Sequence, residues 1–156
     1  MPVEEEHARD RIVDRIIELI GAYAERLDAG DLDEVAALFD QGTFRSTRGG
    51  EPLVGRDAVR RQYDPVLLYD DATPRTKHVL ANIEVVVGDV IDGEAITATS
   101  RCTFAVFQQA NGSDLRAILA GRYHDRFECD DDGWHFVERV VHPDLIGDLS
   151  LHMSRR

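Results

Sequence analysis

Hydrophobic residues near the start of the chain recur with the spacing of an α-helix. Between Arg9 and Leu27 the apolar positions follow a period of about 3.6 residues, which predicts an amphipathic helix with one buried face. These positions are Ile12, Ile16, Leu19, Ile20, Tyr23 and Leu27. Gly30 supplies a stop signal, and Asp31 is the expected N-cap of a short second helix.

Strand-like segments replace the helical pattern in the second half of the chain. Before them, residues 43–47 predict a short strand closed by a Gly49-Gly50 turn, and residues 58–63 predict a third helix limited by Pro65. Alternating and β-branched runs then predict four long strands joined by polar, glycine-bearing hairpin connections. The strands cover residues 76–87, 94–107, 115–128 and 134–141.

Helices followed by an antiparallel meander indicate an α+β domain whose helices cover one face of a curved sheet. The length of 156 residues suits one domain, so we expect residues 1–156 to fold as a single unit. Residues 1–8 are mostly acidic and precede the periodic pattern, so we expect them to form a mobile N-terminus.

The charge of the chain argues against some classes of binding partner. With 18 Lys and Arg against 30 Asp and Glu, the net charge is −12, which argues against binding nucleic acid or an anionic membrane surface. No apolar run approaches the ~20 residues that span a bilayer. Because the N-terminus is acidic, unlike a signal peptide, and the chain has two cysteines, we expect a cytoplasmic protein with reduced thiols.

Several short segments, taken in order, resemble one known family. Residues 23–33 with Leu38-Phe39 resemble the opening of the SnoaL-like proteins, which belong to the nuclear transport factor 2-like superfamily. The likeness covers residues 9–144. Its other segments are residues 53–59, 75–78 with Asn82, 121–125, and 133–136 with Arg139.

The resemblance implies a cone-shaped α+β barrel in which a strongly curved, mostly antiparallel sheet wraps around the long first helix and encloses a deep apolar pocket. It also implies a small hydrophobic metabolite as ligand and a homodimer formed through the outer sheet face, with Thr97, Thr99 and Thr103 contributing. The superfamily includes dehydratases, isomerases, cyclases and non-catalytic binding modules, so the fold by itself implies no single activity.

Four residues resemble the catalytic set of dehydratase-type members, such as scytalone dehydratase and the bile-acid dehydratase. Asp28 and His78 match the Asp and His of that pattern, and Tyr23 and Arg139 match its Tyr and Arg. A carboxylate on one ring nitrogen fixes the tautomer of His78, so the other nitrogen can act as a base. Tyr23 is expected to hydrogen-bond a substrate carbonyl or leaving hydroxyl, and Arg139 to hold an enolate-like oxygen or a carboxylate.

Each of these residues also has an ordinary structural interpretation. Asp28 lies where a helix-end turn residue would lie, and His78 suits a hydrogen-bonded strand histidine. Tyr23 belongs to the apolar stripe and so to the core, while Arg139 would pair with one of the many carboxylates.

Strand alternation adds candidate pocket residues. His78, Leu80 and Asn82 alternate onto one strand face, so we expect Leu80 and Asn82 to line the pocket together with Phe44 and Tyr123. The sequence lacks the spacings typical of metal ligands, phosphate-binding glycine loops and nucleophile elbows. We therefore predict no metal and no cofactor.

The functional hypothesis is a cofactor-independent, dehydratase-type lyase acting on a hydrophobic oxygenated metabolite of polyketide, aromatic or steroid type. Two alternatives stay open, a non-catalytic small-molecule-binding or assembly subunit and a polyketide-type cyclase with the same pocket. The ketosteroid isomerase-like interpretation is disfavoured, because that family's carboxylates align with Thr47 and near Tyr123. The second pocket histidine of scytalone dehydratase has no counterpart in residues 119–121.

Overall fold

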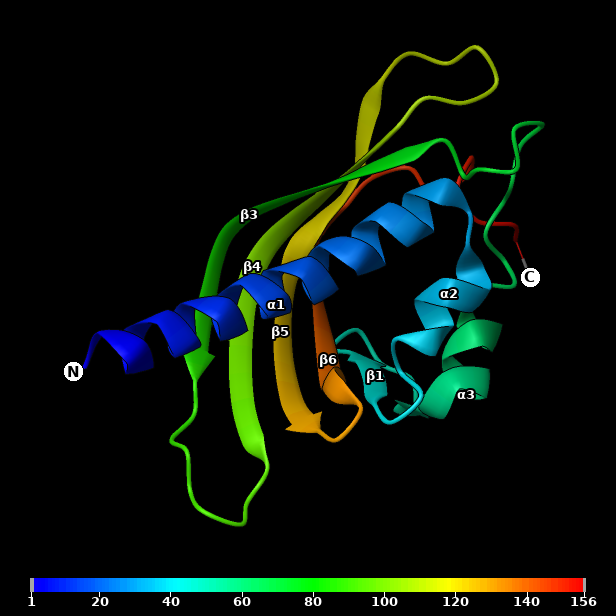
Figure 1. Cartoon of the computed structure of the whole chain (residues 1–156). Helices are drawn as coiled ribbons and strands as arrows, with labels where there is room; N and C mark the ends of the chain where they lie inside the picture. The colour runs from blue at the N-terminus through cyan, green and yellow to red at the C-terminus, as the bar shows by residue number, and fades with distance from the viewer. Residues whose placement is uncertain (1, 156) are drawn as a thin grey trace.

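Three helices and six strands make up the computed structural model, which describes residues 2–155 (Figure 1). The helices are α1 (Val3–Ala29), α2 (Leu32–Ala37) and α3 (Gly55–Gln62). The strands are β1 (Thr43–Ser46), β2 (Leu53–Val54), β3 (Thr76–Val87), β4 (Ile96–Gln108), β5 (Arg116–Asp130) and β6 (Gly133–Ile146). The predicted α+β class is confirmed. β3 has the predicted bounds, and the other long strands differ from prediction only at their ends.

The first helix is longer than its periodic pattern indicated. α1 begins at Val3, before the predicted start at Arg9, because acidic side chains in its first turn are stabilising at the positive end of a helix. It ends at Ala29, before Gly30, whose φ of 79° is left-handed, and a Cβ at Gly30 would collide with the carbonyl oxygen of Ala72. The mobility expected of residues 1–8 stays a prediction. Within the described chain, no helix is both long and apolar enough to cross a membrane.

All strands belong to one curved sheet in the order β2-β1-β6-β5-β4-β3. β3 to β6 form the predicted antiparallel meander, whereas β1 pairs in parallel with β6. The two-residue strand β2 was not predicted, because it is too short to produce a periodic pattern. α1 crosses one face of the sheet, and α2 and α3 pack together at one end of it (Figure 1).

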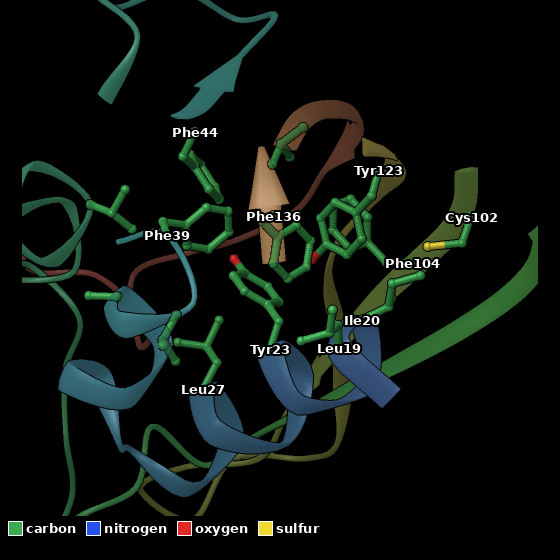
Figure 2. Packing of buried hydrophobic residues seen from close by; sticks show 14 of the residues in the cluster. Leu19, Ile20, Tyr23, Leu27, Phe39, Phe44, Cys102, Phe104, Tyr123 and Phe136 are labelled. Carbon is green, nitrogen blue, oxygen red and sulfur yellow. The ribbon is translucent and has the colours of Figure 1, made fainter. Parts of the chain in front are cut away.

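The hydrophobic core fills the space between α1 and the sheet face that it covers. Figure 2 shows α1 side chains such as Leu19 and Tyr23 meeting the sheet residues Phe104 and Tyr123. Of the predicted α1 stripe, only Ile12 is incompletely buried. On β4 the opposite face is exposed at Thr97, Thr99 and Thr103, as predicted. A homodimer formed through that face stays a prediction.

A β-bulge in β3 changes which side chains face the core. The register with β4 shifts between Ala81 and Glu84, and Asn82 has a φ of 53°. Because an extra residue in one strand reverses the alternation beyond it, Asn82 is exposed and Ile83 packs against the core. The prediction that Asn82 lines the pocket is therefore wrong. Asn82 instead borders a groove on the outer face of the sheet, together with Arg101.

Candidate active site

The two residues predicted to form an acid–base pair are in direct contact. Asp28 lies in the last turn of α1, and His78 lies near the start of β3, which packs along that helix. Nδ1 of His78 is 2.6 Å from Oδ1 of Asp28. Only 5% of the His78 side chain and 10% of the Asp28 side chain are exposed, so the pair is largely shielded from water.

Three hydrogen bonds converge on the Asp28 carboxylate. Oδ1 accepts from Nδ1 of His78 and, at 2.8 Å, from the hydroxyl of Thr76, while Oδ2 accepts from the backbone N–H of His78 at 2.8 Å. Burial acts to raise the pKa of Asp28, but these hydrogen bonds, together with the charge that His78 carries when it is protonated, outweigh burial and lower the pKa. The ionised carboxylate keeps the proton of a neutral His78 on Nδ1. Nε2 therefore carries the free lone pair that a base requires.

A pair of buried tyrosines stands beside the histidine. The hydroxyls of Tyr23, on α1, and Tyr63, directly after α3, are 3.0 Å apart, and the Tyr23 ring meets the His78 ring edge-on. Burial raises the pKa of both tyrosines, so both hydroxyls are protonated near pH 7. One hydroxyl donates to the other, which leaves one O–H proton for a bound molecule. Tyr63 was missed because it lies outside the segments that carry the family resemblance.

Arg139 occupies a different position from the predicted one. Its side chain is fully buried and forms two 2.8 Å hydrogen bonds with the carboxylate of Asp125. The guanidinium carbon lies 4.3 Å from the centre of the Tyr23 ring and 3.9 Å from that of Tyr123. Arg139 is not among the residues that line the cavity described next, so it supports the tyrosine rings rather than contacting a ligand there. The ion pair with Asp125 agrees with the structural interpretation of Arg139 given from the sequence, in which it pairs with a carboxylate.

His78, Tyr23 and Tyr63 line one mostly apolar cavity of about 170 Å³, and Asp28 stands behind His78. Phe44 and Tyr123 line it as predicted, and Figure 2 shows the Tyr23 side chain extending between them. Leu80 is half-buried against the core but does not line this cavity. A mostly apolar cavity with a few convergent polar groups is the usual form of a small-molecule site.

The C-terminal segment brings a second histidine, His152, to the wall of the same cavity. Burial lowers the pKa of His152 to about 4, with the charge of His78 acting in the same direction and Asp28 acting against it. The imidazole is therefore neutral near pH 7. The sequence offered no signal for His152, because it lies beyond residue 144, where the resemblance ends.

The lowered pKa of His152 predicts a loss of stability in acid. Between about pH 6.5 and about pH 4 the unfolded chain takes up a proton at this ring and the folded chain does not, so acidification favours unfolding. Going from pH 7 to pH 4.5 lowers the free energy of unfolding of the wild type. His152→Gln has no titrating group at this position, so we expect its free energy of unfolding to fall by about 2–3 kcal/mol less over the same range. Urea denaturation at the two pH values measures this difference. Equal losses in both proteins would contradict the prediction.

A wider groove of about 530 Å³ lies over the strands β3 to β6. Its lining mixes charged and uncharged side chains, including the exposed ion pair of Arg101 with Glu84, and neither Asp28 nor His78 reaches it. Across residues 2–155, no three His, Cys, Asp or Glu side chains are clustered in a way that would hold a metal ion. The chemistry-bearing groups thus converge on the smaller cavity beneath α1.

Solved structures share this fold at low sequence identity. An NTF2-like protein with a cystatin-like fold from Novosphingobium aromaticivorans aligns with a TM-score of 0.67 and 23% identity, over 91% of this chain and 90% of its own. The beta subunit of a putative aromatic-ring-hydroxylating dioxygenase from the same organism gives a TM-score of 0.69 and 16% identity, over 95% and 99% of the two chains. ActVI-ORFA from Streptomyces coelicolor aligns with a TM-score of 0.63 and 21% identity, over 85% of this chain and 97% of its own.

These likenesses confirm the predicted NTF2-like architecture and carry no information on activity at such identities. Among curated proteins, none matches the chain significantly. The model of the SnoaL-like domain matches residues 9–140, which are most of the chain. The protein therefore belongs to the SnoaL-like domain family.

Proposed function

We propose that the protein is a dehydratase-type lyase that removes water from a hydrophobic β-hydroxy carbonyl compound, with its own side chains carrying the proton transfers. The observation that carries the proposal is the 2.6 Å contact of His78 with Asp28 at the wall of a cavity lined mainly by apolar side chains. A histidine oriented by a buried carboxylate is the arrangement that general-base catalysis needs.

His78 would act first as base and then as acid. Nε2 takes the proton from the carbon next to the substrate carbonyl, and the C–H electron pair forms an enolate. Asp28 stabilises the imidazolium that results. The enolate then expels the β-hydroxyl group, a C=C bond forms, and the departing oxygen takes the proton from His78 and leaves as water. The base is restored, and no oxidant or reductant is consumed.

The tyrosine pair would stabilise the enolate. One O–H proton of Tyr23 and Tyr63 remains free after their mutual hydrogen bond, and a neutral buried hydroxyl is a suitable donor to an oxygen on which charge develops. The Arg139 guanidinium close to the Tyr23 ring acts to lower the pKa of Tyr23, against the larger opposing effect of burial. Arg139 thus makes Tyr23 a stronger hydrogen-bond donor.

A direct test is turnover of β-hydroxycyclohexanone, a one-ring β-hydroxy ketone, to cyclohexenone. Formation of the conjugated enone is followed by its ultraviolet absorbance, and the loss of water is confirmed by mass. We expect a rate above the buffer rate that survives dialysis against EDTA. In D₂O, the base would also exchange the proton next to the carbonyl.

Two results would favour the alternatives. A product of unchanged mass from a substrate that carries a second carbonyl would indicate a cyclase, because ring closure of an enolate need not lose water. Binding of the ketone with neither turnover nor deuterium exchange would indicate a binding or assembly subunit and would contradict the lyase proposal.

A further inference from the structure

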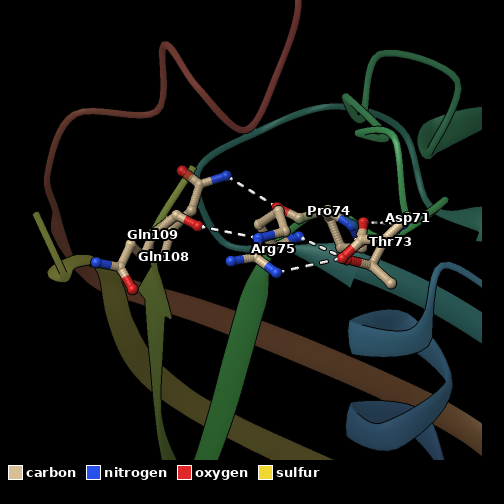
Figure 3. A network of polar contacts seen from close by, with 6 residues as sticks. All are labelled: Asp71, Thr73, Pro74, Arg75, Gln108 and Gln109. Atoms are coloured by element: carbon tan, nitrogen blue, oxygen red, sulfur yellow. Dashed lines mark hydrogen bonds and ion pairs between the residues drawn. The ribbon is translucent and has the colours of Figure 1, made fainter. Parts of the chain in front are cut away.

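Hydrogen bonds hold the C-terminal segment, residues 149–154, against the cavity. The buried side-chain amide of Gln108 donates to the carbonyl of Leu151 at 2.9 Å and to that of Pro74 at 3.0 Å, and Figure 3 shows the second of these bonds. The hydroxyl of Tyr69 also donates to the carbonyl of Leu151. Gln108 thus ties the segment to the loop that leads into β3, and so to the strand of His78.

Backbone contacts fix His152 itself. Its carbonyl accepts from the N–H of Leu67 at 2.8 Å, its N–H donates to the carbonyl of Leu149 at 2.9 Å, and the next residue, Met153, forms a β-bridge with Val66. These contacts fix the backbone at His152 and at the residue that follows it. The ring of His152 is therefore held at the cavity wall and does not belong to a loose terminus.

The imidazole of His152 retains unused hydrogen-bonding capacity. Among the described residues, its Nδ1 is buried and has no hydrogen-bond partner. A neutral imidazole carries one N–H donor and one lone pair, and a buried polar group without a partner costs free energy. A ligand oxygen beside this ring would recover some of that cost, whereas a purely apolar ligand would not.

The size of the cavity limits the ligand. A closed apolar cavity of about 150 Å³ accommodates benzene, and the cavity beneath α1 has a volume of about 170 Å³. A single six-membered ring with one or two oxygen substituents matches this volume. The four fused rings of a steroid would have to extend beyond it.

From these observations we infer that His152 is a second ligand-binding histidine, which hydrogen-bonds an oxygen substituent of a one-ring metabolite while His78 faces its carbon skeleton. The inference deepens the proposed function, because it names the size class of the substrate and the group that recognises its oxygen.

Phenol and toluene test this inference without turnover, because they have nearly the same shape and neither can lose water by elimination. The measured quantity is the ratio of their dissociation constants, by calorimetry or ligand-observed NMR. We expect His152→Leu to shift this ratio against phenol by about fivefold to tenfold, since one hydrogen bond is lost, and to leave toluene binding nearly intact. His152→Gln should keep most of the preference, and His124→Gln, on the outer sheet face, should change nothing.

A second readout does not depend on a variant. In the wild-type protein, phenol should shift the ¹⁵N resonances of the His152 ring and toluene should not. An unchanged ratio in a folded His152→Leu protein, or equal responses of the ring to both probes, would overturn the inference. So would failure of both probes to bind the wild type. Oxygen recognition through His152 without turnover of the hydroxy ketone would leave the inference standing and remove the lyase proposal.

Discussion

Replacing His78 by Gln is expected to slow dehydration of β-hydroxycyclohexanone by about 10²–10⁴-fold, because a positioned general base contributes that much to a proton transfer. The amide of Gln can still donate a hydrogen bond to Asp28 but has no basic nitrogen. The Michaelis constant should change little, since the lost interaction belongs to the transition state. Deuterium exchange next to the carbonyl should fall by a similar factor.

Two further variants serve as a comparison and a control for this experiment. Asp28→Asn keeps the size of the side chain and removes the charge that stabilises the imidazolium, so its rate should also fall while the cavity is preserved. His124→Gln changes a histidine on the outer face of the sheet and should leave the rate unchanged. If His78→Gln turned over the ketone within about threefold of the wild type, His78 would not be the base.

The contact between Asp28 and His78 could be predicted because both residues lie at places that local patterns define. Asp28 ends a strongly periodic helix, and His78 opens a strand whose bounds the alternation identified correctly. The family resemblance then connected two positions that are 50 residues apart in sequence. What joins them in space is the packing of α1 along β3, which follows from burying the helix stripe against the sheet.

Other parts of the site depend on tertiary features that no local sequence pattern predicts. The bulge near Asn82 reverses the alternation of β3 because one residue is added. Residues 79–81 and 85–87 are continuous apolar runs, so the sequence does not show where the alternation changes. Asp125 is one of 30 acidic residues, and only the pairing of β5 with β6 places it opposite Arg139. His152 reaches the cavity through backbone hydrogen bonds, which carry no side-chain signature.

Replacing Arg139 by Met is expected to lower the free energy of unfolding by about 3–5 kcal/mol, because it leaves the carboxylate of Asp125 buried without a partner. For a domain of this size, that corresponds to a fall in Tm of roughly 10 °C at pH 7, measured by circular dichroism. The cost arises from the uncompensated charge, and the lost contacts with the rings of Tyr23 and Tyr123 add to it.

An ion pair on the surface with similar geometry serves as a control for the effect of burial. Arg122 and Asp144 form two hydrogen bonds of 2.8 Å and 3.0 Å, much like the buried pair, but 47% and 43% of these side chains are exposed. Arg122→Met should therefore lower the free energy of unfolding much less than Arg139→Met does. Adding Asp125→Leu to Arg139→Met removes the stranded charge and should recover much of the lost stability. Equal costs for the two single Arg substitutions would show that burial of the Asp125 carboxylate is not what makes Arg139 indispensable.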